Sequence, residues 1–321
     1  MHIPDGFING STSLGAGIAA AGGIGAGLRH AGKRLADRQI PLAGLAAAFI
    51  FAAQMINFPV AVGTSGHLIG GGLAAVLLGP WLASVVLAVV VGVQALIFAD
   101  GGVSALGLNI INMAIVAPWT AWFIYRGLRA LLPRTQRAVA VAAGVAAAFS
   151  VEIAALGFVG EYAIGGTGGA PVPTVLIAMG GVHALIGIGE GLITGAIVAA
   201  VLAARPDIVA GAADLLDPAA SPPRRLGRFV LAGVGAALLV AAFLSPFANS
   251  NPDGLQRVAE DKGFVETAQT SPVDEGSPLA GYKAGGDGVI ATAVAGVLGV
   301  GITFGIGYGV VRLSRRTKAQ R

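Results

Sequence analysis

The sequence predicts an all-α integral membrane protein: a seven-helix bundle with its N-terminus outside, followed by a two-helix appendage that carries an extracytoplasmic loop. Three observations support this fold class. Hydrophobic residues make up 55% of the 321 residues and charged residues only 11%, whereas a soluble domain carries about 25% charged residues. Long apolar runs recur along the chain, and most Lys and Arg residues collect in a few short segments between them.

Each apolar run of about 20 residues is expected to cross the bilayer as a helix. The first run, residues 11–28, has no Lys or Arg before it, so we expect a retained span and not a signal peptide. The run at 68–79 is short and is counted as a crossing or its equivalent. The expected spans are residues 11–28, 40–58, 68–79, 81–98, 103–125, 138–164, 174–203, 229–247 and 289–311.

The basic residues set the expected orientation of these spans. Of the 20 Lys and Arg residues, 17 lie in four segments, residues 29–38, 126–137, 205–228 and 312–321. Cytoplasmic loops are enriched in Lys and Arg. All four segments fall on one side only when three crossings separate residue 59 from residue 126. We therefore expect an extracytoplasmic N-terminus and a cytoplasmic C-terminus.

A proline-containing stretch of mixed charge divides the chain. We expect a membrane domain over residues 1–205, a cytoplasmic linker over 206–228 and a two-span domain over 229–321. The outer loop of the second domain, residues 248–288, carries seven acidic and three basic residues. Its net charge of −4 either concentrates cations near the outer face or simply keeps the loop in solvent.

The start of the chain offers a set of nitrogen atoms. With a free α-amine on Met1, that amine, the His2 amide and the His2 ring can form a planar chelate suited to Ni(II), Cu(II) or Co(II). The predicted topology places His67 on the same side, and the chain has no cysteine. Thr64 and Ser65 are candidates to orient the His67 ring. The alternative is that His2 is an ordinary polar residue and that His67 bonds a backbone carbonyl at a helix start.

Polar residues inside spans are costly and point to a role. His183 and Glu190 are seven residues apart and share a helix face, where a buried structural or subunit-interface role is favoured over metal binding. Glu152, in the middle of another span, fits a helix–helix hydrogen bond. Further candidates to line a polar interior are Gln54, Asn57, Gln94, Asn109 and Asn112.

Enzymatic function has one weak indication. Gly63-Thr64-Ser65-Gly66 has the form of a nucleophile turn, with His183 as a candidate base for an intramembrane serine hydrolase, but a single such motif carries little weight. The Gly32-Lys33 pair is followed by Arg34, so no ATP-binding P-loop is present. If the chain moves a solute against a gradient, its energy must come from another chain or from an ion gradient. We expect a transport component and not an enzyme, with a passive or gradient-driven metal channel as an alternative.

Several stretches together resemble the CbiM/NikM family, the substrate-binding membrane components of energy-coupling-factor transporters for cobalt and nickel. They are Met1-His2-Ile3-Pro4-Asp5-Gly6, Gly63–Leu68, Leu78–Trp81 and His183–Thr194. The resemblance covers about residues 1–205. It implies seven transmembrane helices and a metal ion held by the Met1 amine, the amide and ring nitrogens of His2, and the His67 ring.

A later stretch, Asn251-Pro252-Asp253-Gly254-Leu255, is similar to the PDGLE domain, which is fused to such proteins or is a separate partner. The resemblance implies capture and translocation of divalent nickel or cobalt at the inner membrane of a bacterium or archaeon. The implied partners are a transmembrane coupling protein and cytoplasmic ATPase subunits, and no organic cofactor is expected. By analogy, the small-residue faces around Ala16–Ala20 and Ala43–Ala47 are expected to contact the coupling protein.

Overall fold

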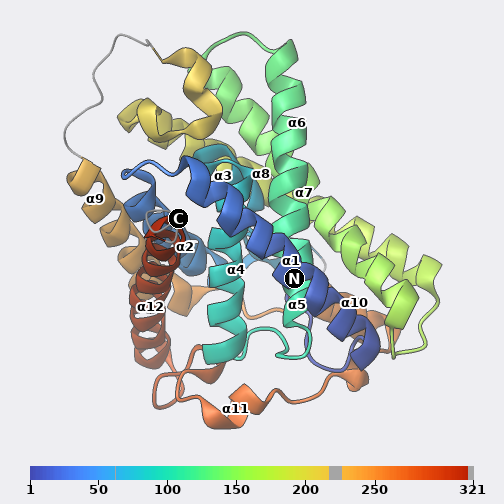
Figure 1. Cartoon of the computed structure of the whole chain (residues 1–321). Coiled ribbons are helices and arrows are strands. Elements are labelled where there is room, and N and C mark those ends of the chain that lie inside the picture. The colour runs from blue at the N-terminus through green and yellow to red at the C-terminus, as the bar shows by residue number, and fades with distance from the viewer. Residues whose placement is uncertain (62, 217–225, 317–321) are drawn as a thin grey trace.

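The computed structural model describes residues 1–61, 63–216 and 226–316, and these are mostly helical (Figure 1). The first part contains α1 Gly10–Arg34, α2 Gln39–Gln54, α3 Gly71–Leu78, α4 Pro80–Ile97, α5 Leu106–Asn109, α6 Ala117–Leu131, α7 Gln136–Gly165 and α8 Val172–Ala204. The C-terminal segment, residues 226–316, contains α9 Leu226–Leu239, α10 Gly254–Lys262, α11 Pro272–Gly276 and α12 Val289–Arg316. Short 3₁₀ or π turns lie at Ile110–Val116, Pro206–Ile208, Ala210–Leu215, Val240–Leu244, Ser245–Phe247, Val265–Thr267 and Ala280–Tyr282.

The long helices begin at residue types that favour a helix start. Asn9 and Thr135 cap α1 and α7, because their side-chain oxygens accept from the backbone N–H groups of Thr12 and Ala138. Such caps satisfy donors that the first turn leaves unpaired. Pro80 is the first residue of α4. Its missing backbone N–H carries no penalty there, because an N–H at that position has no partner within the helix. The helix limits therefore follow from local sequence.

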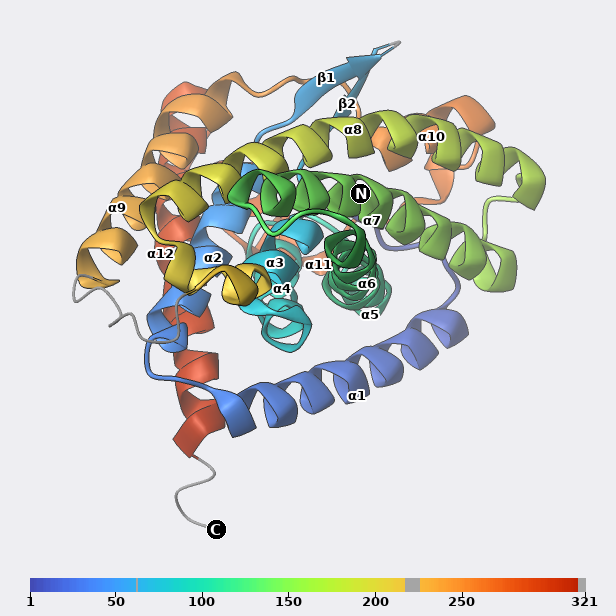
Figure 2. The same cartoon turned by 90° about the horizontal axis from the view of Figure 1, so that it is seen from above.

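The closest helix pair is α7 and α8, which run antiparallel along one side of the molecule (Figure 2). Small residues permit this approach, since a Cβ atom on Gly144 would lie 2.6 Å from the Gly191 carbonyl oxygen and one on Gly191 would lie 2.7 Å from that of Gly144. Backbone contact of this kind holds helices together in a bilayer. Helix α1 crosses the opposite edge of the molecule (Figure 2).

Six helices in the described residues are long and apolar enough to cross a membrane: Pro80–Ile97, Leu106–Leu131, Gln136–Gly165, Val172–Ala204, Leu226–Phe247 and Val289–Arg315. The apolar runs of the sequence predict nine spans. The difference lies in the first three helices. Helix α1 is rich in glycine, α2 has 16 residues, and α3 has eight, which is about 12 Å at the α-helical rise. The nine-span topology therefore remains a prediction.

A small β-hairpin departs from the all-α expectation and lies just before the expected 68–79 element. Strands β1, Phe58–Ala61, and β2, Thr64–Gly66, pair antiparallel. Residues 67–70 are not helical, and α3 begins only at Gly71. Gly70 has a positive φ of 80°, a conformation that glycine adopts without strain. The chain thus reaches α3 through an extended stretch that carries His67.

The C-terminal segment packs on the first part chiefly through α2. Helix α12 lies along α2 so closely that a Cβ atom on Gly307 would be 3.0 Å from Ala47 Cβ and 3.5 Å from the Ala43 carbonyl oxygen. The face around Ala43–Ala47, which we expected to contact a coupling protein, is therefore covered by α12 in this chain. The linker residues 217–225 lie outside the described residues.

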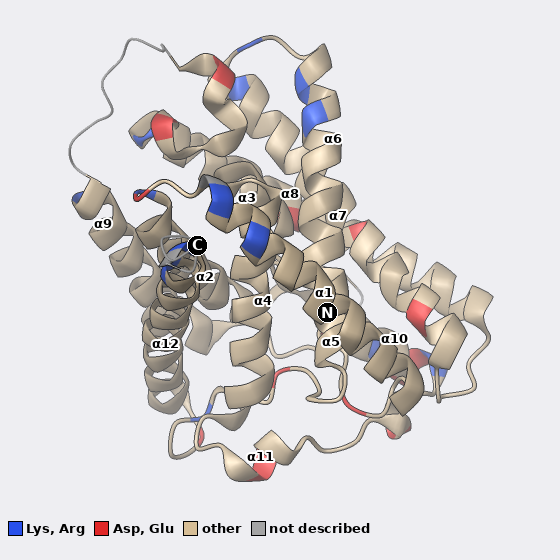
Figure 3. Ribbon diagram, in the orientation of Figure 1, with Lys and Arg blue, Asp and Glu red and all other residues tan. Residues whose placement is uncertain are grey.

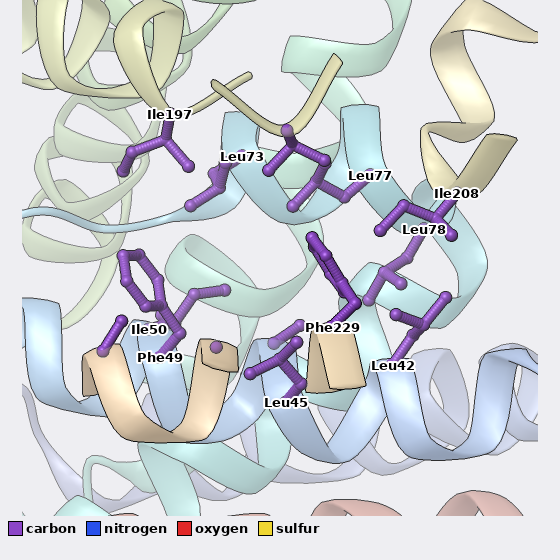
Figure 4. A pocket seen from close by; sticks show the side chains of 14 residues that line it. Leu42, Leu45, Phe49, Ile50, Leu73, Leu77, Leu78, Ile197, Ile208 and Phe229 are labelled. Atoms are coloured by element: carbon purple, nitrogen blue, oxygen red, sulfur yellow. The ribbon is translucent and has the colours of Figure 1, made fainter. Parts of the chain in front are cut away.

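A cavity of about 140 Å³ lies at this seam, between α2, α3, α8 and α9 (Figure 4). Leu45, Leu73, Ile197 and Phe229 each contribute one side chain from one of these helices. The whole lining is apolar, so it offers a divalent cation no ligand. This cavity is therefore not a candidate metal site.

Charged residues lie mainly at the two ends of the molecule, with an apolar zone between them (Figure 3). Arginines gather where α6 and α7 are joined, and acidic residues mark the opposite end, at the loop after α4 and at α10 and α11 (Figure 3). The loop 248–288 is folded. Leu255, Val258, Ala259 and Phe264 are buried in it, each exposing 2% or less.

Candidate metal centre

The first nine residues form an arm that enters the helical bundle. Met1 and Ile3 are both buried. The Ile3 amide donates to Asn109 Oδ1 at 2.8 Å, and Asn109 Nδ2 donates back to the Ile3 carbonyl at 3.0 Å. The Gly102 amide donates to the same carbonyl at 2.9 Å. These bonds hold the backbone just after His2 and so position the terminal amine.

Asp5 anchors the same arm to the loop after α4. Its carboxylate accepts from the Val103 amide at 3.1 Å, the Ser104 amide at 2.7 Å and the Ser104 hydroxyl at 2.5 Å. The loop comes so close that a Cβ atom on Gly102 would lie 2.3 Å from the Asp5 nitrogen. On the other side, the Gln269 amide donates to the Asp5 carbonyl at 2.8 Å. Asp5 therefore joins the arm to both parts of the chain.

His67 is delivered by the extended stretch after β2. Glu190 of α8 accepts from the Ile69 amide at 2.6 Å and from the Gly70 amide at 2.9 Å. Gln54 of α2 donates to the Ile69 carbonyl at 2.7 Å. The His67 Nδ1–H donates to the Leu68 carbonyl at 3.1 Å. In a neutral ring this leaves the lone pair on Nε2.

The two histidines and the terminal amine meet at one point. The Met1 amine is in hydrogen-bond contact with His67 Nε2. The rings of His2 and His67 are stacked, with centroids 5.1 Å apart and planes 16° from parallel. The structure thus brings together the three residues that the sequence singled out.

The C-terminal segment contributes Asp253 to the same point. Asp253 caps α10, because its Oδ1 accepts from the Gln256 amide at 2.8 Å, and its Oδ2 lies 3.3 Å from the Met1 amine. The same oxygen lies 3.8 Å from His67 Nε2. The Ser65 amide donates to the Pro252 carbonyl at 2.9 Å, which ties the hairpin to this turn. One carboxylate from a distant part of the sequence therefore faces the nitrogen atoms.

The surroundings keep both rings neutral. Burial, and then the positive charge of the Met1 amine, lower the pKa of His67 to about 3. Burial also lowers the pKa of His2, although Asp100 acts in the opposite direction. Burial acts to raise the pKa of Asp253, but the amine and His67 outweigh it and hold that pKa below its usual range. Neutral imidazoles are the form that binds metals.

No group of three or more His, Cys, Asp or Glu side chains in the described ranges is placed to share a metal ion. A metal ion at this point would depend on backbone nitrogen as well as on the two rings. Nitrogen-rich, planar donor sets suit Ni(II) and Cu(II).

Comparison with known proteins identifies the family of the chain. A family model described as the cobalt uptake substrate-specific transmembrane region, CbiM, matches residues 2–208, and the PDGLE domain matches residues 227–316. The chain belongs to the CbiM family. A putative fused nickel transport protein, NikMN, of Archaeoglobus fulgidus is 35% identical over 318 residues, which cover 98% of this chain and 99% of that protein. The cobalt transport protein CbiM of Geobacter sulfurreducens is 34% identical over 191 residues, which cover 57% of this chain and 54% of that protein.

A solved structure supports the same assignment. The crystal structure of a truncated transition metal transporter superposes with a TM-score of 0.57 and 31% identity, covering 64% of this chain and 99% of that one. The chain is therefore a multi-pass membrane protein of a nickel and cobalt transport family, with a CbiM region and a PDGLE domain. The relatives are named as transport proteins, in agreement with the expected transport role.

Thr64 and Ser65, the expected orienting residues, do not bond the His67 ring. Thr64 is buried in β2, and Ser65 Oγ donates to the Asn251 carbonyl of the PDGLE domain at 2.7 Å. His183 Nδ1 donates to a carbonyl of its own helix, and its Nε2 has no hydrogen-bond partner among the described residues. Ser65 and His183 thus form no nucleophile–base pair, and the geometry gives no support to a hydrolase.

Glu190 and His183 were expected to share a buried structural or interface role, but in the structure they contact different parts of the chain. It holds the backbone of Ile69 and Gly70, two and three residues after His67 in the CbiM region. His183 instead packs beneath the PDGLE motif, where a Cβ atom on Gly254 would lie 2.9 Å from its ring. Glu152 on α7 is half-buried, with one carboxylate oxygen unpaired within the described part of the chain.

Replacing Glu190 with Ala is expected to lower the thermal unfolding midpoint of the detergent-purified protein and to weaken nickel binding. The change strands two buried N–H groups next to His67, each at a cost of about 1–3 kcal/mol. Glu152→Ala is the matched control, since it removes an acid of another span whose Oε2 has no partner. Equal unfolding midpoints for the two variants would contradict the assigned role of Glu190.

The sequence did not predict that five residues around the centre would contact the N-terminal arm or its supports. Gln94 and Asn109 were expected to line a polar interior, and the structure places them against His2 and Ile3. Asp253 was noted only as part of the PDGLE motif. Asp100 and Tyr282 carried no sequence signal, because their contacts join positions 182 residues apart.

Proposed function

We propose that this chain captures Ni(II) or Co(II) on the outer face of a cytoplasmic membrane and serves as the substrate-binding component of an ATP-driven energy-coupling-factor transporter. The observation that carries the proposal is the meeting of the Met1 amine, the His2 ring and the His67 ring in a buried site. We assign the metal ion four nitrogen ligands: the Met1 amine, the His2 amide, His2 Nδ1 and His67 Nε2. Such a set favours Ni(II), while the choice between nickel and cobalt depends on site shape and supply.

The distribution of charge supports an outer location for this site. Arginines at the α6–α7 connection mark one end of the molecule (Figure 3), and Lys and Arg are enriched on the cytoplasmic side of membrane proteins. The metal centre lies toward the acidic end, with Asp100 and Asp253 beside it. On this basis we assign the arm and the PDGLE loop to the outer side and the end of α12 to the inner side.

Energy for transport is assigned to partner proteins. The sequence contains no P-loop, so ATP binding falls to cytoplasmic ATPase subunits, and a transmembrane coupling protein joins them to this chain. The Ala16–Ala20 face of α1 remains a candidate contact for the coupling protein, whereas α12 covers the Ala43–Ala47 face.

Radioactive nickel uptake tests this assignment. Cells that express the chain together with coupling and ATPase subunits are expected to accumulate nickel, and inactivation of the ATPase is expected to abolish uptake. The same chain alone in liposomes is expected to transport none. Uptake by the chain alone would overturn the ATP-driven assignment in favour of a passive or gradient-driven channel.

A further inference from the structure

A closed ring of hydrogen-bond contacts joins His2 to the PDGLE domain. His2 Nδ1 lies 3.1 Å from Asp100 Oδ1, and the Tyr282 hydroxyl donates to Asp100 Oδ2 at 2.6 Å. Gln94 Nε2 donates to the same hydroxyl at 3.3 Å. Gln94 Oε1 lies 3.1 Å from His2 Nε2, which closes the ring. Tyr282 is the one member that comes from outside the CbiM region.

The protons of Tyr282 and Gln94 in this ring can be assigned by counting donors. A tyrosine hydroxyl has one proton, and the shorter contact, to the Asp100 carboxylate, takes it. Burial and the Asp100 charge raise the pKa of Tyr282 well above its usual value, so the hydroxyl keeps that proton. Gln94 must then present its NH₂ group to Tyr282 and its carbonyl oxygen to His2. That oxygen only accepts, so it favours the proton of a neutral His2 ring on Nε2, whereas the Asp100 carboxylate, which also only accepts, favours it on Nδ1. The contacts therefore define the orientation of the His2 ring and not its tautomer.

When a metal ion binds Nδ1 in place of a proton, Nε2 keeps the ring proton and donates it to Gln94 Oε1. Nδ1 is the ring nitrogen that can close a six-membered chelate with the amide nitrogen of the same residue. A metal-binding histidine commonly donates its other N–H to an acceptor that fixes the ring's orientation and tautomer. Gln94 Oε1 is such an acceptor, and Tyr282 determines which way the Gln94 amide faces.

We propose that Tyr282 of the PDGLE domain is a positioning residue for the metal centre, acting through Gln94 and Asp100 to hold the His2 ring in the orientation that presents Nδ1 to the metal ion. The inference rests on the proposed function, because it assumes that His2 binds the transported metal. It adds that a residue of the PDGLE domain sets the orientation of a metal ligand in the CbiM region.

The placement of Tyr282 is itself tightly determined. Its ring stacks on Phe98, with centroids 4.9 Å apart and planes 23° from parallel, and the neighbouring Gly281 amide donates to the Phe98 carbonyl at 2.8 Å. Ala99 and Tyr282 are the non-glycine residues with positive φ in the described part of the chain, at 54° and 59°. Backbone strain of this kind concentrates at functional sites. Here Tyr282 belongs to the ring of hydrogen-bond contacts, and Ala99 directly precedes another member, Asp100.

Nickel binding to the purified full chain tests the inference. Tyr282→Phe keeps the aromatic stack and removes only the hydroxyl, and it is expected to weaken nickel binding by about 10–100-fold. The visible absorption band of bound Ni(II) is expected to shift, because the His2 ring is no longer held in one orientation. Tyr308→Phe, the same chemical change on α12, is the matched control and is expected to keep the parental affinity and spectrum.

A second variant separates positioning from general damage. Gln94→Met removes the acceptor for His2 Nε2 at similar volume, and the double variant with Tyr282→Phe is expected to lose little more than Gln94→Met alone, since both act along one path. Parental affinity and an unchanged Ni(II) spectrum in Tyr282→Phe would overturn the inference, as would fully additive losses in the double variant. Absence of nickel binding by the parent chain would overturn the proposed function and this inference together.

Discussion

A chain with two glycines added before Met1 is expected to lose nickel binding at this site while remaining folded. The extension converts the Met1 amine into a peptide nitrogen and moves the new amine away by up to about 7 Å. Met1 is only 4% exposed, and its amine already contacts His67 and lies 3.3 Å from Asp253, so the site has no room for another residue. Loss of a direct ligand should exceed the roughly 10–100-fold cost of losing a supporting contact.

Isothermal titration calorimetry with Ni(II) measures this effect. The same two glycines added after Arg321 are the control, because they change the length of the chain at the other terminus. His67→Ala is expected to match the N-terminal extension in nickel affinity, since each removes one nitrogen ligand. Parental stoichiometry in either variant, with an unchanged unfolding midpoint, would show that the nitrogen atoms of Met1 and His67 do not bind the metal.

The long helices could be predicted from the sequence because apolar run length and local caps determine them. The expected run at 138–164 corresponds to α7, Gln136–Gly165, and the run at 174–203 corresponds to α8, Val172–Ala204. The run at 68–79, counted as a crossing or its equivalent, forms the short helix α3, Gly71–Leu78, after a non-helical start. Its glycines permit an extended stretch that is held by Glu190 and Gln54, and these contacts come from helices that no local pattern specifies.

The candidate ligands were predictable, but the residues that support them were not. Met1, His2 and His67 stand out because histidine is scarce and cysteine is absent. Asp100 and Tyr282 carry no comparable signal, since an acid in a loop and a tyrosine near a span are both common on a membrane protein surface. Their role follows only from the fold, which brings the PDGLE loop against the end of α4.

The PDGLE domain covers the arm at three points. Asp253 faces the Met1 amine, Gln269 pairs with Asp5, and Tyr282 holds Asp100 beside His2. Gly6 has a positive φ of 91°, and a Cβ atom there would collide with the Thr267 carbonyl oxygen. Asp5 and Gly6 therefore pack against the PDGLE domain, and Asp5 also bonds the CbiM region.

Replacing Asp5 with Ala is expected to weaken nickel binding by about 100-fold in a chain that stays folded. The carboxylate holds three donors of Val103 and Ser104, and hydrogen bonds to a charged group contribute about 1.5–3 kcal/mol each. Without them the arm is held only through its backbone. The Met1 amine and His2 ring are then no longer fixed before the metal arrives, and a loss of about 3 kcal/mol corresponds to about 100-fold in affinity.

Nickel titration of Asp5→Ala and Asp274→Ala separates loss of the anchor from loss of negative charge. Asp274 is an acid of the PDGLE loop that also accepts a backbone N–H, that of Ser271, but it lies in α11 and does not contact the arm. Asp5→Asn should bind with intermediate affinity, because its amide oxygen can still accept one bond while its NH₂ group faces a second donor. If Asp5→Ala and Asp274→Ala bound nickel equally well, the arm would owe its position to the Ile3–Asn109 bonds alone, and Asp5 would be only one acid among several near the outer face.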